Sequence, residues 1–125
     1  MKIEDIKFKA KRLDNSREWV EGDLKRSSSY VGICYPSSVF PDVPIVHRVD
    51  PSTVCQFTGL TDKNGTPIYE GDVVIYKDNN AERRGNINWD SKAAAFCFGQ
   101  DFLVHYPSEN MVVIGNKYDK KIIDY

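Results

Sequence analysis

The densest group of chemically versatile side chains lies in the stretch LTDKNGTPIYEGDVV, residues 60–74. It holds two glycines, a tyrosine and the acids Glu70 and Asp72, which stand two positions apart. On a β-strand this spacing puts both carboxylates on one face, where they could bind a metal ion or form an acid–base pair. A hydrolytic site also needs a positioned partner, and His47 and His105 lie in unrelated segments without a paired spacing. We therefore interpret the two acids as parts of a corner and predict no catalytic residue.

The three cysteines suggest two further kinds of chemistry. Cys55 could form a nucleophile pair with either histidine, but buried cysteines more often serve as small apolar groups. A zinc site would have to draw four ligands from three cysteines and two histidines that are scattered without short paired spacings. Nucleotide binding has no support, because the chain lacks a phosphate-binding loop of the form GxxxxGK[ST]. We therefore predict neither a metal ion nor any other cofactor.

Basic residues supply the one remaining candidate site. Lys77, Arg83 and Arg84 flank the loop before the segment GNINW, where they could contact phosphates while an aromatic side chain stacks on a base. A net charge of −1 weighs against nucleic acid, and Glu82 stands directly beside Arg83. Nucleic-acid binding through these residues is therefore kept as the alternative function.

The positioning elements are predicted to be β-strands. The chain has 125 residues, of which 41% are hydrophobic, and this is enough for a folded domain. Prolines 36, 41 and 44 remove backbone donors, so residues 36–44 are predicted to form a long loop. Alternating apolar and polar runs predict strands at residues 6–13, 18–24, 30–35, 45–49, 72–76, 85–89, 94–98 and 110–115. The last four strands follow one another closely and favour a small barrel.

Turn chemistry gives more detail around the opening stretch. Asn64 and Gly65 predict a type I′ turn, in which both central residues have positive φ. Gly71 and Asp72 predict a second corner, where the carboxylate accepts backbone N–H groups that the bend leaves free. Asp50 is predicted to cap a single helical turn that begins at Pro51.

The segment QFTGLTDKNGTPIYEGDVV, residues 56–74, resembles the signature of the YopX proteins of phages and prophages. VIGNKYDK at residues 113–120 is similar to the closing motif of that family, and IKFKAKRLD at residues 6–14 is similar to its start. The resemblance implies an N-terminal β segment with the proline-rich loop, residues 1–55, followed by a C-terminal domain, residues 56–125, of coiled β-sheets containing an SH3-like barrel. It implies no activity and supplies no site residue.

We expect a non-enzymatic protein-interaction or assembly module rather than an enzyme. Unpaired strand edges and a loop at residues 36–44 that could reach a neighbour favour a homo-oligomer, with a phage or host protein as a further partner. The absence of a signal peptide or an apolar spanning segment predicts a cytoplasmic protein and no membrane partner. The resemblance to phage and prophage proteins implies that this cytoplasm is that of a bacterial host. Aromatic side chains are available for either the core or a binding surface: Trp19, Tyr30, Tyr35, Trp89, Phe98 and Tyr106.

Overall fold

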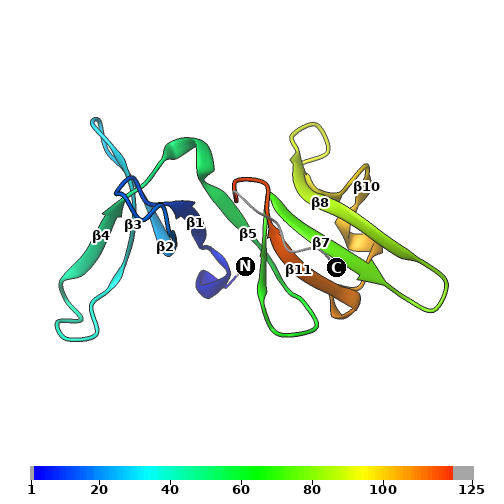
Figure 1. Cartoon of the computed structure of the whole chain (residues 1–125). Coiled ribbons are helices and arrows are strands. Elements are labelled where there is room, and N and C mark those ends of the chain that lie inside the picture. The colour runs from blue at the N-terminus through cyan, green and yellow to red at the C-terminus, as the bar shows by residue number, and fades with distance from the viewer. Residues whose placement is uncertain (1, 120–125) are drawn as a thin grey trace. The chain divides into compact units, whose positions relative to one another are not determined.

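The computed structural model describes residues 2–119, and its regular secondary structure is mainly β-strand (Figure 1). Eleven strands are joined by turns, and the helices among the described residues are four 3-10 turns of three residues each. The predicted mainly β class is therefore confirmed. The chain divides into two compact units, Met1–Phe57 and Thr58–Tyr125, here called the N-terminal and C-terminal units.

The N-terminal unit is an antiparallel sheet in the order β4-β3-β2-β1-β5. Its elements are η1 (Ile3–Asp5), β1 (Phe8–Lys11), β2 (Trp19–Arg26), β3 (Val31–Pro36), β4 (Pro44–Arg48), η2 (Pro51–Thr53) and the first residues of β5 (Cys55–Thr61). The core of this unit contains the buried side chains of Ala10, Val20, Ile33 and Val49. The predicted cap is present, since the carboxylate of Asp50 accepts the N–H of Ser52 at 3.0 Å.

Strand β2 changes partner along its length. Its first half pairs with β1, up to Gly22 opposite Phe8, and its second half pairs with β3, starting with Asp23 opposite Cys34. A Cβ atom at Gly22 would lie 2.3 Å from the carbonyl oxygen of Cys34. The missing side chain is therefore what lets β2 pass this close to the backbone of β3.

The C-terminal unit contains a second antiparallel sheet in the order β10-β9-β8-β7-β11. The elements of the C-terminal unit are β6 (Pro67–Tyr69), β7 (Asp72–Lys77), β8 (Glu82–Asp90), β9 (Ala95–Phe98), β10 (Asp101–Phe102), η3 (Leu103–His105), η4 (Ser108–Asn110) and β11 (Met111–Asn116). The remaining residues of β5 lie beside β6. Strands β10 and β11 end the sheet, and no pairing among residues 2–119 joins them to form a closed barrel.

The turn between β5 and β6 is built around the carboxylate of Asp62 instead of a type I′ turn. Gly65 has a φ of +81°, but Asn64 does not have a positive φ, so that part of the prediction is wrong. The carboxylate accepts the N–H groups of Asn64 and Thr66 at 2.8 and 2.9 Å, which holds Asn64 in an ordinary conformation. Its second oxygen accepts the N–H of Val113 at 2.9 Å, so the same turn anchors β11.

Candidate functional site

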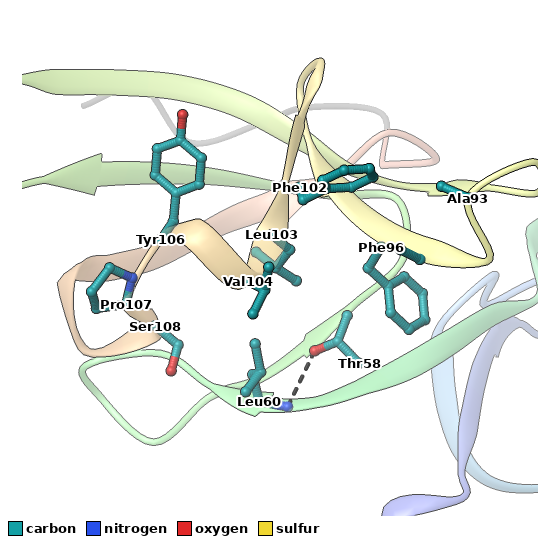
Figure 2. Close-up of a pocket in the computed structure, with 11 residues that line it drawn as sticks. Thr58, Leu60, Ala93, Phe96, Phe102, Leu103, Val104, Tyr106, Pro107 and Ser108 are labelled. Atoms are coloured by element: carbon teal, nitrogen blue, oxygen red, sulfur yellow. Dashed lines mark hydrogen bonds between the residues drawn. The ribbon is translucent and has the colours of Figure 1, made fainter.

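A groove of about 660 Å³ opens in the C-terminal unit and is lined mainly by apolar side chains (Figure 2). Leu60 comes from β5, Phe96 from β9, and Leu103 and Val104 from η3. Figure 2 shows the side chains of Leu60 and Val104 pointing toward one another across the groove. The lining is completed by Thr58, Ala93, Ala95, Phe102, Tyr106, Pro107 and Ser108. Segments that are far apart in the sequence therefore build one surface.

The two residues of the short helical turn η3 that line the groove differ sharply in exposure. Leu103 is 4% exposed and packs in the core of the C-terminal unit, whereas Val104 is 83% exposed. Phe102, in the two-residue strand β10 just before the turn, is 44% exposed. Large apolar side chains gathered at one concave surface are typical of a binding site.

Tyr106 stands at one side of this groove and is fixed by three kinds of contact. Its ring packs edge-on against Phe98 and Tyr76, with centroids 5.0 and 5.1 Å apart. Its hydroxyl donates to the carboxylate of Asp101 at 2.6 Å. The guanidinium of Arg83 bonds the same carboxylate at 2.9 Å, contacts the Tyr106 hydroxyl and lies 5.2 Å from the centre of the Tyr106 ring. The groove therefore has one preorganised wall.

This cluster shifts the pKa of both acidic groups in it. The hydrogen bond from Tyr106, followed by that from Arg83, lowers the pKa of Asp101, and the bond to Asp101 raises the pKa of Tyr106. Because the pKa of Tyr106 is raised in the folded chain, its hydrogen bond to Asp101 contributes fully to stability below the tyrosine pKa of the unfolded chain, about 10. The contribution is lost as pH rises through the Tyr106 pKa of the folded chain. The lowered pKa of Asp101 has the opposite sign: its contribution is present above about pH 3.9 and is lost as pH falls through the folded value.

Replacing Asp101 by asparagine should lower the pKa of Tyr106 toward about 10, because the charged acceptor is removed. The titration can be followed by NMR of tyrosine ring carbons, with the Tyr106 signal assigned from a Tyr106→Phe variant. Asp23→Asn, at an exposed acid of the N-terminal unit, is the matched control and should leave the signal unchanged. An unchanged Tyr106 pKa in Asp101→Asn would contradict the hydrogen bond.

The three basic residues predicted from the sequence do not converge on one site. Neighbouring residues of a strand point to opposite faces, so Arg83 and Arg84 of β8 face away from each other. Arg83 is held over Phe98 and Tyr106 and is paired with Asp101, as described above. Lys77 lies on the face of Arg84, but it stands directly opposite Glu82 in the sheet. Acids therefore accompany both Arg83 and Lys77.

The candidate acids of the corner are separated in the structure. Asp72 is fully buried, and its carboxylate accepts the N–H of Tyr69 at 2.8 Å and the side-chain amide of Asn116 at 2.9 Å. Glu70 lies in the turn before Gly71, and its carboxylate makes no hydrogen bond or ion pair within residues 2–119. Asp72 therefore acts as a structural acceptor that joins the ends of β6 and β11.

The cysteines and histidines are also dispersed. Cys55 and Cys97 are buried and Cys34 is half-buried. The Nε2 atom of His47 is hydrogen-bonded to the hydroxyl of Tyr35 at 2.9 Å. Within the described part of the chain, no group of three or more His, Cys, Asp or Glu side chains is arranged to hold a metal ion. None of the helices between residues 2 and 119 has the length and apolar character needed to cross a membrane.

The sequence pattern pointed to only part of the groove. Tyr106 was among the aromatic residues that it singled out, but Phe96, Phe102 and Val104 were missed. A signal was present, since Phe102, Leu103 and Val104 form an apolar run directly after residues 99–101. That run is too short to show a strand or helix period, and so it gave no prediction.

Comparisons with known proteins identify the family of this chain. Searches of curated proteins and of solved structures found no significant match. The family model described as YopX protein matches residues 3–121, which is nearly the whole chain. The match includes the turn at Asp62, the corner at Gly71 and Asp72, and the segments that line the groove, and the chain therefore belongs to the YopX protein family.

Proposed function

We propose that this protein is a non-enzymatic protein-interaction module whose groove binds an apolar segment of a protein chain. The observation that carries the proposal is the exposure of Val104 and Phe102 at a concave apolar surface with a rigid aromatic wall. A protein segment with one or two large apolar side chains would cover both residues and gain the free energy of their burial, about 25 cal/mol for each Å² removed from water.

The chemistry of the lining supports binding rather than catalysis. None of the eleven lining residues is charged or carries a histidine or cysteine side chain. Its polar side chains are the hydroxyls of Thr58, Tyr106 and Ser108, and that of Thr58 already donates to the carbonyl of Ile68 at 2.7 Å. General acid–base or nucleophilic catalysis would need a group with a suitable pKa within reach of the bound molecule.

Peptide selection tests the proposal directly. A displayed library of random short peptides is panned on the full chain, and the selected peptides are then compared on two variants. Val104→Glu places a charge in the groove at a side chain that is 83% exposed, and Ile3→Glu makes the same kind of change at one that is 80% exposed elsewhere. We expect apolar peptides that bind the wild-type and Ile3→Glu chains and lose binding to Val104→Glu. Failure to find any such peptide on protein diluted until it has its single-chain mass would refute the groove as a binding site.

Nucleic-acid binding is the less favoured function, because the basic candidates are divided between two faces and accompanied by acids. Single-stranded and duplex oligonucleotides should bind with Kd values no tighter than about 10⁻⁴–10⁻⁶ M at physiological salt, the usual non-specific range. Fluorescence anisotropy measures this, with Lys77→Ala and Arg84→Ala as the diagnostic variants. Nanomolar binding that these variants abolish would make nucleic acid the preferred ligand.

A further inference from the structure

The hairpin of β3 and β4 carries a second exposed apolar surface, in the N-terminal unit. Among the residues that the structure describes, twelve large hydrophobic side chains are exposed, and five of them lie within residues 39–46. These five are Val39, Phe40, Val43, Ile45 and Val46. Scattered exposed apolar residues are ordinary on protein surfaces, but a concentration of this kind marks an interaction site. Residues 37–46 are called the arm below.

The tip of the arm is held in shape by its own hydrogen bonds. The hydroxyl of Ser37 accepts the N–H groups of Val39 and Phe40 at 3.2 and 3.1 Å, and Val43 donates to the carbonyl of Phe40 at 2.9 Å. Prolines at both ends of the tip and within it restrict the backbone further: Pro36, Pro41 and Pro44. Val39 and Phe40 are thus presented outward, 71% and 65% exposed, on a preorganised loop that loses little conformational freedom on binding.

Charge supplies a reason to match the arm with the groove. Asp42, between Phe40 and Val43, makes no hydrogen bond or ion pair within residues 2–119. At the groove, Lys92 immediately precedes the lining residue Ala93, and its ammonium group likewise has no partner within those residues. An apolar tip with an adjacent unpaired acid therefore complements the end of the apolar groove at Ala93, where the neighbouring residue is a base; at Ser108, the other end in Figure 2, the neighbouring residue is the acid Glu109.

We propose that the arm of one chain occupies the groove of a second copy, with Phe40 in the groove and Asp42 facing Lys92. This inference rests on the proposed function, because it names the occupant of that groove. Each chain carries one arm and one groove. Reciprocal exchange between two chains therefore closes a twofold dimer, and one-way addition produces a ring or an open chain.

Complementation between two variants tests the contact. Phe40→Glu removes the occupant and Val104→Glu blocks the groove, and both changes fall on exposed side chains, so each variant should retain the wild-type far-ultraviolet circular dichroism. Light scattering should give a multiple of 14.3 kDa for the wild type and for the control Ile3→Glu, and the single-chain mass for each arm or groove variant. An equimolar mixture of the two variants should form a species of two chains, since the arm of Val104→Glu still fits the groove of Phe40→Glu.

Three results would overturn the inference: a monomeric wild type, an oligomer that survives Phe40→Glu, or a mixture of the two variants that stays at the single-chain mass. The last outcome would show that the two changes disrupt a shared surface rather than an arm and its groove. A synthetic peptide of residues 36–46 provides a direct binding probe. It should bind the Phe40→Glu chain, whose groove is open, and should not bind the Val104→Glu chain.

The charge pair provides a test of orientation. Asp42→Lys and Lys92→Asp should each weaken self-association roughly two- to fivefold, as expected for an exposed ion pair, and the double reversal should restore it. If both single changes weaken self-association and the double reversal does not restore it, the arm binds in a different orientation from the one proposed.

These experiments separate the two proposals. If random peptides require Val104 but Phe40→Glu leaves the oligomer unchanged, the groove binds a foreign segment, and only the self-association inference fails. If the binding of random peptides and of the peptide of residues 36–46 is unaffected by Val104→Glu, the groove is not a binding site, and the proposed function fails as well.

Discussion

Replacing Asp72 by alanine should lower the free energy of unfolding by roughly 2–6 kcal/mol, because it removes one acceptor from each of two buried donors at about 1–3 kcal/mol each. The donors are the backbone N–H of Tyr69 and the side-chain amide of Asn116. Each of these two residues is only 1% exposed. Since small domains have a total stability of about 5–15 kcal/mol, the loss would be visible as a large decrease in the urea midpoint.

Two further variants make this prediction specific. Asp72→Asn keeps the size of the side chain and one carbonyl oxygen, so it should cost less than Asp72→Ala. Glu70→Ala, two residues away in the same corner, removes a carboxylate that has no partner among residues 2–119 and should change stability by about 0.5 kcal/mol or less. Equal effects at Glu70 and Asp72 would contradict the structural role of Asp72.

Alanine in place of Gly22 should destabilise the N-terminal unit by roughly 1–3 kcal/mol or more, the range for inserting atoms into a packed site. The added Cβ would lie 2.3 Å from the carbonyl oxygen of Cys34, and a backbone atom cannot move aside as the end of a flexible side chain can. The sign is informative, because a glycine-to-alanine change at an unstrained site usually stabilises a protein by about 0.4–1 kcal/mol. Thermal unfolding measures the change.

The next residue of β2 supplies the control for Gly22. Asp23 is exposed, and Asp23→Ala should stay within about 0.5 kcal/mol of the wild type. A Gly22→Ala variant as stable as Asp23→Ala would mean that β2 and β3 can separate at this point without cost. In that case the close approach of β2 to Cys34 would not be required by the fold.

Most strands of this fold could be predicted from local pattern. The segment DVVIY at residues 72–76 has apolar residues at four consecutive positions, and it forms the buried strand β7, Asp72–Lys77. The predicted strand at residues 30–35 appears as β3, Val31–Pro36. The strands that were missed, β5, β6 and β10, are interrupted by glycine or are only two or three residues long, so no alternation could develop in β6 or β10.

The turn at Asn64 and Gly65 shows a limit of local rules. Asparagine and glycine adopt a positive φ at little energetic cost, so this pair considered without the rest of the fold favours a type I′ turn. The carboxylate of Asp62 instead binds two N–H groups of the turn, and its other oxygen binds Val113, which is 51 residues away in the chain. A contact at that separation depends on where the fold brings β11, and no pattern within the turn contains this information.

The sequence by itself determined the β class, most strand positions and the two acids of the corner, because strand alternation and turn chemistry act over a few neighbouring residues. Only the tertiary structure decided the groove and the role of the basic residues. Leu60, Phe96 and Val104 become neighbours through strand pairing and the turn η3, and Arg83 meets Asp101 because β8 and β10 flank β9 in one sheet. Proximity of this kind is set by long-range hydrogen bonding and by burial of the shared core, which no local pattern encodes.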